Sequence, residues 1–211
     1  MKCLPCDAES IAGINAHLKH RTSRVIVPQP HADDPAYYAD RYNHSDEWAF
    51  WLPDGRMSEP RTWQPPYSVG DVVAVTETWA TERGLDCFPP SECTGIGAPI
   101  YYKVHDIAGE GRVQRGRWRP ARFMPADFAR FHAIITSIDV GRIQSMTYDE
   151  IVAEGWPGLS PTSDEPNMEE RSLARKWWTA RWDGINAKRG YPYSMNPWAY
   201  GYGFEVVEVK R

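Results

Sequence analysis

Long hydrophobic runs are missing from this sequence of 211 residues. A helix that crosses a membrane needs about 20 consecutive, mostly apolar residues, and no segment approaches that length. The first six residues, Met1 to Cys6, also lack the apolar stretch of a secretory signal peptide. We therefore expect a protein with no membrane partner and a cytoplasmic location.

Cysteine is scarce, and its spacing argues against a metal site. The four cysteines are Cys3, Cys6, Cys87 and Cys93. The first two have the spacing of half a zinc site, but the five residues between the last two do not complete it. His105 and His132 have no partner at metal-ligand spacing either. We expect free thiols, no metal and no cofactor, and a four-cysteine zinc site is the open alternative.

An excess of positive charge is missing as well. The chain carries 24 Lys and Arg against 28 Asp and Glu, which gives a net charge of −4. A protein that contacts many phosphates of a nucleic acid needs a broad basic surface, and this composition does not supply one. Basic residues do gather in 17–24 and 112–122, so one local positive cleft is compatible with the negative total.

Tryptophan, in contrast, is abundant, with 10 residues. The indole ring is large and amphipathic, so it suits either a core or a surface on which another ring stacks. We assign Trp177, Trp178 and Trp182 to the core. Both interpretations stay open for Trp79, Trp118 and Trp156.

The apolar pattern predicts strands at 25–27, 48–52, 72–75, 100–104, 131–143 and 204–209. Three long excursions interrupt these elements, at about 28–66, 84–126 and 156–170. The first excursion holds seven prolines and many acidic residues, and we interpret it as too polar to belong to the core.

Three helices are expected. The first covers 8–20, with Asp7 as its N-cap. Thr147 and Glu150 have the spacing of a capping box, which starts a short helix over 148–154. The longest helix runs from Glu169 to about Lys188. Its pattern predicts a buried face lined by Leu173, Trp177, Ala180 and Gly184 and widened by Trp178, Trp182 and Ile185.

The order of these elements matches neither repeated βαβ units nor a helical bundle. It favours an α+β fold, a small mixed β-barrel with helices at the barrel mouth and long loop insertions. We expect one domain over 1–211, with the three excursions as its insertions.

Three segments in order carry a resemblance to a known family. Residues 19–24 have the pattern K-x-x-T-x-R, residues 70–79 begin with Gly-Asp and end with Glu-Thr-Trp, and residues 143–155 end with Glu-Gly. Together they resemble the ASCH family, a branch of the PUA-like β-barrel proteins. Further similarity to the larger phage and prophage members of that family lies in 118–125, 182–190 and 196–198.

The resemblance implies a PUA-like barrel and a partner that is a modified nucleoside or RNA. Some ASCH-like proteins are amidohydrolases that remove acyl groups from N4-acylated cytidine nucleosides, and others are linked to RNA binding or RNA cleavage. A shared fold does not choose among these activities. If the chain is phage-encoded, its location is the host cytoplasm.

The family's amidohydrolase pattern implies three catalytic residues, which match Lys19, Thr22 and Glu154. A threonine hydroxyl is a weak nucleophile that needs an adjacent base, and the amine of a desolvated lysine can act as that base. The glutamate would orient the substrate amide or carry a proton to the leaving amine. The structural alternative makes Lys19 a solvated helix end or a partner of Glu154, and makes Thr22 the start of a strand.

Four further residues are candidates for substrate binding, namely Arg24, Glu77, Trp79 and Arg119. An arginine suits a phosphate group, and Trp79 suits stacking on a base. Glu77 follows a buried strand closely, so we expect it near the barrel mouth. In the alternative interpretation the arginines are solvated charges and Glu77 caps a neighbouring loop.

Two hypotheses of different class follow. In the first, the protein is an amidohydrolase that removes an acyl group from N4-acylated cytidine or a related modified base. In the second, it is a PUA-like module that binds RNA, with or without ribonuclease activity, or a phage accessory protein without turnover. The net charge of −4 favours a small nucleoside over a long RNA.

Overall fold

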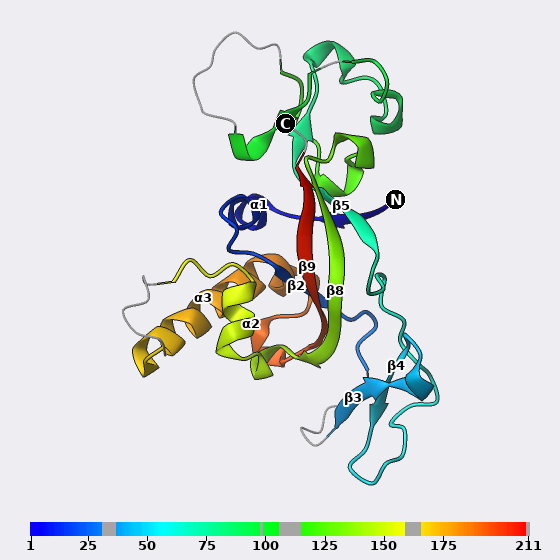
Figure 1. Ribbon diagram of the computed structural model, residues 1–211, viewed down its shortest axis with the longest axis vertical. Coiled ribbons are helices and arrows are strands. Elements are labelled where there is room, and N and C mark those ends of the chain that lie inside the picture. Colours follow the sequence, from blue (N-terminus) through cyan, green and yellow to red (C-terminus); the bar gives the residue numbers. More distant parts are fainter. Residues whose placement is uncertain (31–36, 98, 106–114, 159–165, 210–211) are drawn as a thin grey trace. The chain divides into compact units, whose positions relative to one another are not determined.

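The structure is a computed structural model that describes residues 1–30, 37–97, 99–105, 115–158 and 166–209 (Figure 1). Each of the three expected insertions therefore includes some residues that lie outside the described part of the chain. The chain folds as two compact units. The first unit consists of 1–17, 70–134 and 205–211, and the second consists of 18–69 and 135–204. Two long strands, β8 (Phe131–Arg142) and β9 (Trp198–Val209), contribute residues to both units.

The main sheet has five strands in the order β1-β5-β8-β9-β2. Strand β1 (Lys2–Pro5) is parallel to β5 (Val72–Thr76), whereas β5 is antiparallel to β8 and β2 (Arg21–Val25) is antiparallel to β9. Together with the helices, this mixed sheet confirms the α+β class. The pairings between described strands do not close the sheet, so the barrel stays a prediction.

The first unit follows the local signals of its sequence. Helix α1 (Ala8–Asn15) begins at Asp7, whose carboxylate accepts a hydrogen bond from the Ser10 amide, and it ends before residue 20. The middle of β5 is fully buried, as its continuous apolar run predicts. The short strands β6 (Trp79–Ala80) and β7 (Tyr101–Tyr102) form an antiparallel pair, so the expected strand at 100–104 is shorter than predicted.

In the second unit, helix α2 (Tyr148–Ala153) begins with the capping box that the sequence predicts. The Thr147 hydroxyl accepts a hydrogen bond from the Glu150 amide at 3.2 Å, and the Thr147 amide donates to the Glu150 carboxylate at 2.7 Å. Helix α3 (Met168–Asn186) begins at the N-cap Asn167 and packs against α2. None of the helices in the described part of the chain is long and apolar enough to span a membrane.

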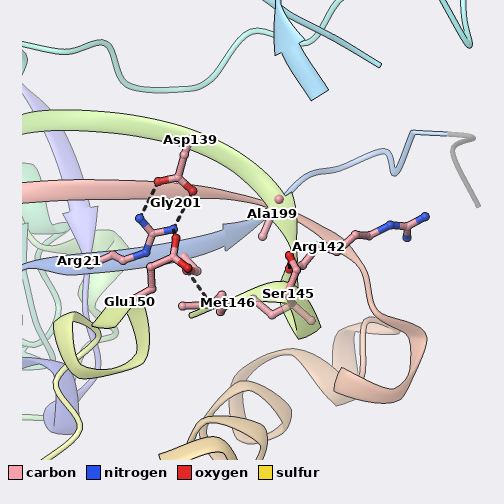
Figure 2. A pocket seen from close by; sticks show the side chains of 11 residues that line it. Arg21, Asp139, Arg142, Ser145, Met146, Glu150, Ala199 and Gly201 are labelled. Atoms are coloured by element: carbon pink, nitrogen blue, oxygen red, sulfur yellow. Dashed lines mark hydrogen bonds and ion pairs between the residues drawn. The ribbon is translucent and has the colours of Figure 1, made fainter. Parts of the chain in front are cut away.

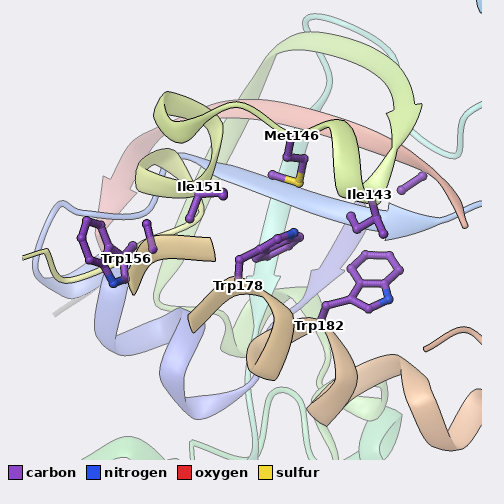
Figure 3. Close-up of a cluster of buried hydrophobic side chains, with 8 residues drawn as sticks. Ile143, Met146, Ile151, Trp156, Trp178 and Trp182 are labelled. Atoms are coloured by element: carbon purple, nitrogen blue, oxygen red, sulfur yellow. The ribbon is translucent and has the colours of Figure 1, made fainter. Parts of the chain in front are cut away.

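The buried face of α3 differs from the predicted one. Its buried residues are Ala174, Trp178, Trp182 and Asn186, whereas Leu173 is 37% exposed. The two buried indoles pack with side chains of residues 143–156 (Figure 3). The structure thus confirms Trp178 and Trp182 as buried. The predicted centre of the face was wrong, because Leu173, Ala180 and Gly184 are exposed.

Part of the first excursion belongs to the core, which corrects our interpretation of the whole segment as too polar. Strands β3 (Tyr38–Arg41) and β4 (Trp48–Trp51) form a hairpin, and Trp48, Phe50 and Trp63 are buried. The Phe50 ring meets Trp198 of β9 with ring centroids 4.8 Å apart. The average polarity of this segment concealed a small number of large aromatic side chains that pack on the sheet.

Strand β2 also begins earlier than the sequence predicts, at Arg21 rather than at Val25. Its ladder with β9 pairs Arg21 with Gly203 and Val25 with Ala199. Polar residues occupy this strand because the partner strand satisfies its backbone, while its side chains bond to other parts of the unit. The closing strand likewise starts at Trp198 instead of residue 204.

Candidate functional site

The structure brings together two of the three expected catalytic residues, although 134 positions separate them in the sequence. The Lys19 ammonium donates to the Glu154 carboxylate at 2.6 Å and to the Glu154 carbonyl oxygen at 2.8 Å. Lys19 is 5% exposed and Glu154 is 6% exposed. The interpretation of Lys19 as a solvated helix end is therefore wrong, and its pairing with Glu154 is confirmed.

Local backbone geometry explains why this pair forms. Lys19 lies two residues before the start of β2, and Glu154 caps the C-terminal end of α2. The His20 amide donates to the Ala153 carbonyl oxygen at 3.0 Å, which ties the two segments together. Gly155 has a φ of +100°, and a Cβ atom there would lie 3.1 Å from the Lys19 Cβ atom. A glycine after Glu154 thus allows the left-handed backbone of this turn and its close approach to Lys19.

One oxygen of the pair is left without a partner. Glu154 Oε2 accepts from Lys19, whereas Glu154 Oε1 is buried and has no hydrogen-bond partner among the described residues. A buried carboxylate oxygen without a donor lowers stability. A bound molecule with an N–H or O–H group would satisfy this oxygen.

Arg21 carries a second set of charge contacts, with Asp139 and Glu150 (Figure 2). Its guanidinium makes two bonds to the Asp139 carboxylate, at 2.5 and 2.7 Å, and lies 3.2 Å from a Glu150 oxygen. Burial lowers the pKa of Arg21, but the bond to Asp139 and the charges of Asp139, Glu150 and Glu154 outweigh burial and raise the pKa overall. Arg21 is therefore a permanent cation in the middle of an acidic group.

A small cavity lies next to this guanidinium, and we call it the Arg21 cavity. Its volume is about 40 Å³, and its walls include Arg21, Ser23, Asp139, Ser145, Glu150 and Gly201. Pockets that hold small-molecule ligands typically measure about 300–1,000 Å³. The Arg21 cavity has room for water but not for a nucleoside.

Thr22, the third expected catalytic residue, lies on the other face of β2. Successive side chains of a strand point to opposite faces, and directly paired residues of neighbouring strands share a face. Thr22 pairs with Tyr202 and is 5% exposed, whereas Arg21 and Ser23 face the Arg21 cavity. Arg24, a candidate binding residue, pairs with Tyr200 on the same face as Thr22.

Glu77 lies in the first unit and is paired there. Two nitrogens of Arg130 donate to Glu77 Oε1, at 2.9 and 2.7 Å, and Glu77 is 2% exposed. Burial raises the pKa of the Glu77 carboxyl, and the bond and charge of Arg130 oppose that shift. Arg130 also covers the Tyr102 ring at 4.5 Å. This arrangement holds Glu77 against a single cation.

Trp79 and Arg119 also lie in the first unit, inside its core. Trp79 is fully buried, with the Phe128 ring centroid at 5.3 Å and the Arg119 guanidinium at 5.2 Å from its own ring. Arg119 is 5% exposed and donates to the Leu85 carbonyl oxygen at 2.9 Å. A ligand could touch either side chain only if this core opened. Trp156 is likewise buried, in the core around α3.

The cysteines and histidines do not assemble in the described part of the chain. All four cysteines are free thiols, and burial raises the pKa of the Cys3 thiol. Among the described residues, no group of three or more His, Cys, Asp and Glu side chains is placed to hold a metal ion.

Sequence reasoning missed Asp139 and Glu150 as members of the charged group. Asp139 is one polar residue in a long strand, and Glu150 was interpreted through its role in the capping box. One signal was available for Glu150, because residues four apart on a helix share a face and Glu154 follows it at that distance. Comparisons with family models, curated proteins and solved structures found no match to this chain.

Proposed function

We propose that the protein is a nucleoside-directed, ASCH-type amidohydrolase with a PUA-like barrel, which removes an acyl group from N4-acylated cytidine or a related modified base. The observation that carries the proposal is the buried pair of Lys19 and Glu154 with its unpartnered carboxylate oxygen. The proposal includes a cytoplasmic location, which the four free thiols support.

The chemistry of the pair suits hydrolysis of an amide. In the proposed reaction an oxygen nucleophile adds to the acyl carbonyl, and the Lys19 ammonium stabilises the negative charge that develops on the carbonyl oxygen. The C–N bond then breaks, and Glu154 carries a proton from the nucleophile to the leaving N4 amine. With water as the second reactant, the products are a carboxylic acid and the unmodified cytidine.

Substrate binding in this proposal requires the site to open. The Arg21 cavity is too small for a base, and Lys19 and Glu154 are enclosed. The segment around Glu154 would have to separate from Lys19 for the substrate amide to reach both groups. The unpartnered Glu154 oxygen lowers the cost of that separation, because the closed site does not satisfy the carboxylate fully.

The proposal is tested with a panel of N4-acylcytidines, whose deacylation is followed by chromatography. We expect turnover by the wild-type protein. Lys19→Ala and Glu154→Gln should each lose about 10²–10⁴ in rate, because the first removes the cation that stabilises the oxyanion and the second removes the group that carries the proton. Arg56→Gln, which removes an exposed arginine paired with Asp54, is the matched control and should keep full activity. Absence of turnover across the panel would falsify the proposal.

Two variants of Thr22 identify the attacking oxygen. If the Thr22 hydroxyl attacks, as the resemblance implies, Thr22→Ala abolishes turnover and Thr22→Ser keeps part of it. If water attacks, both variants keep turnover. The face of β2 on which Thr22 lies favours water in the closed structure.

The alternative function is binding of RNA or of a modified nucleotide without turnover. One observation favours it. The Lys19 ammonium already donates hydrogen bonds to both the carboxylate and the carbonyl oxygen of Glu154, as in a purely structural ion pair. In that case a nucleoside or RNA ligand binds, no deacylation occurs, and Lys19→Arg changes stability rather than chemistry.

A further inference from the structure

A second and larger cavity lies on the face of β2 opposite the Arg21 cavity. We call it the Arg24 cavity. Its volume is about 390 Å³, within the range of small-molecule binding sites. Its walls include Arg24, Val27, Arg61, Trp63, Gln64 and Tyr200. No motif of the family resemblance covers residues 61–66, which supply much of this wall.

Aromatic side chains make one wall of the Arg24 cavity. Trp63 is 7% exposed and Tyr200 is 5% exposed, so both rings are fixed by packing. The Phe50 ring meets Trp63 edge-on, with ring centroids 4.8 Å apart. The Trp63 indole nitrogen donates to the Pro28 carbonyl oxygen at 3.3 Å. This wall is therefore formed before any ligand arrives.

The chain around the cavity is held by one side-chain amide. The Gln29 amide nitrogen donates to the carbonyl oxygens of Ile26 and Trp198, at 2.6 and 3.0 Å. The Gln29 amide oxygen accepts from the Trp198 backbone amide at 2.7 Å. Gln29 thus continues the connection between the two chain segments beyond the end of β2, and it fixes the backbone of residues 26–28 at the cavity.

Two arginines give the cavity its polar character. The Arg61 guanidinium lies over the Trp63 ring at 4.5 Å and pairs with Glu59 at 3.0 Å, so its charge is partly balanced. Arg61 is an exposed residue, and its planar group forms the outer layer of a stack on Trp63. Arg24 is half-buried on β2 and is the second cation of the lining.

We propose that the Arg24 cavity binds a phosphorylated aromatic ligand of the size of a nucleoside monophosphate. The ligand's ring stacks on the layer formed by Arg61 and Trp63, since guanidinium planes and indoles both stack on bases. The phosphate group is held by Arg24, because arginine donors match phosphate oxygens. This site is distinct from the proposed amide-hydrolysing site, because Arg24 and Arg21 lie on opposite faces of β2.

The test measures binding of cytidine 5′-monophosphate, cytidine and inorganic phosphate by isothermal titration calorimetry. We expect saturable binding of the monophosphate at one site and weaker binding of cytidine. Arg24→Gln should lower the affinity for the monophosphate about tenfold or more, because it removes a charged donor to the phosphate. The affinity for cytidine should stay unchanged. Arg61→Gln should lower the affinity for both ligands, since it removes the guanidinium plane on which their ring stacks.

Controls separate a lost contact from a lost fold. Arg56→Gln removes an exposed arginine outside the cavity lining and should bind the monophosphate like the wild type. Arg24→Lys keeps a positive charge and should recover part of the affinity, and thermal melting of each variant shows whether it is folded. The proposal is overturned if the wild type does not bind the monophosphate, or if folded Arg24→Gln binds it as tightly as the wild type.

The same chemistry is present in a free nucleotide and at the phosphorylated end of RNA, and a further titration distinguishes these sources. A short oligonucleotide with a 5′-phosphate is compared with the same oligonucleotide without it. Tighter binding of the phosphorylated form, lost in Arg24→Gln, supports the site with RNA as the source. If the two oligonucleotides bind equally and the monophosphate still binds, the ligand of the cavity is a free nucleotide. Monophosphate binding is measured without any turnover, so a failure of the hydrolysis proposal leaves this result intact.

Discussion

Charged side chains held away from water are the residues on which this structure depends most. The pair of Lys19 and Glu154 and the group around Arg21 both lie at the junction of β2 and α2. Removing one member of a buried ion pair costs about 3–5 kcal/mol, because the remaining charge has no partner. Loss of activity in a variant at these positions is therefore informative only when its stability is measured as well.

Gly155 is the residue that allows the pair to form. We expect Gly155→Ala to lower the free energy of unfolding by about 1–2 kcal/mol, because its backbone is left-handed and the new methyl group would press on Lys19. The measurement is urea-induced unfolding. Gly84→Ala is the matched control, since Gly84 lacks a left-handed φ and a methyl group there meets no atom within 4 Å. Equal losses in both variants would contradict this account.

Tyr200 gives a prediction about alkaline pH. Burial raises the pKa of its phenol to about 12, whereas an unfolded tyrosine has a pKa of about 10. Above pH 10 the unfolded chain loses this proton while the folded chain keeps it. The stabilising contribution is therefore complete below about pH 10 and disappears as the pH rises toward 12.

Unfolding in urea between pH 9 and 12 checks this prediction. We expect the stability of Tyr200→Phe to fall less steeply across this range than that of the wild type, because one ionising group has been removed. Tyr38→Phe, at an exposed position of β3, should follow the wild type. A Tyr200→Phe protein with the same slope as the wild type would show that ionisation of Tyr200 does not oppose folding.

Among the elements, α3 shows how packing selects one face of a helix. We expect Trp178→Ala to lower the free energy of unfolding by about 3–5 kcal/mol, because it removes a large side chain from the core drawn in Figure 3. Leu173→Ala, on the stripe that the sequence favoured, should cost less than about 1 kcal/mol because Leu173 is 37% exposed. A larger loss in Leu173→Ala than in Trp178→Ala would restore the original assignment of the face.

Elements with local signals were predicted well, and elements set by distant partners were not. The N-caps at Asp7 and Thr147 and the apolar run of β5 each depend on a few neighbouring residues, and the structure confirms them. The start of β2 depends on β9, which lies far away in the sequence, so a polar sequence became a strand without a local signal. The centre of the buried face of α3 was also missed, because the side chains that cover Trp178 and Trp182 come from other segments of the chain.

The charge of the whole molecule leads to a prediction about nucleic acids. Each phosphate contacted in single-stranded RNA adds a slope of about −0.7 to the dependence of log affinity on log salt concentration. With a net charge of −4 and two arginines at the Arg24 cavity, we expect a slope no steeper than about −1.4. Fluorescence anisotropy with a labelled oligonucleotide at several salt concentrations measures it. A much steeper slope would reveal a more extended basic surface.

The pairing of Lys19 with Glu154 was within reach of sequence reasoning, whereas the Arg24 cavity was not. The resemblance drew attention to Lys19 and Glu154, each in one short motif, and their pairing was the structural alternative to a catalytic role. The cavity combines residues 24–28, 61–66 and Tyr200, and its aromatic wall comes from an excursion that looked too polar for a core. Only the folded chain shows that these residues meet, because no local pattern connects them.

Aromatic residues in the first excursion and directly after it have a practical consequence for shortened versions of this protein. Phe50 packs on Trp198, and Tyr67 packs on Tyr202 with ring centroids 5.2 Å apart. A chain that lacked residues 28–67 would lose this cover, and the aromatic rings of β9 would be exposed to solvent. We expect this shortened chain to self-associate through the exposed aromatic rings, so the excursion protects the protein from aggregation.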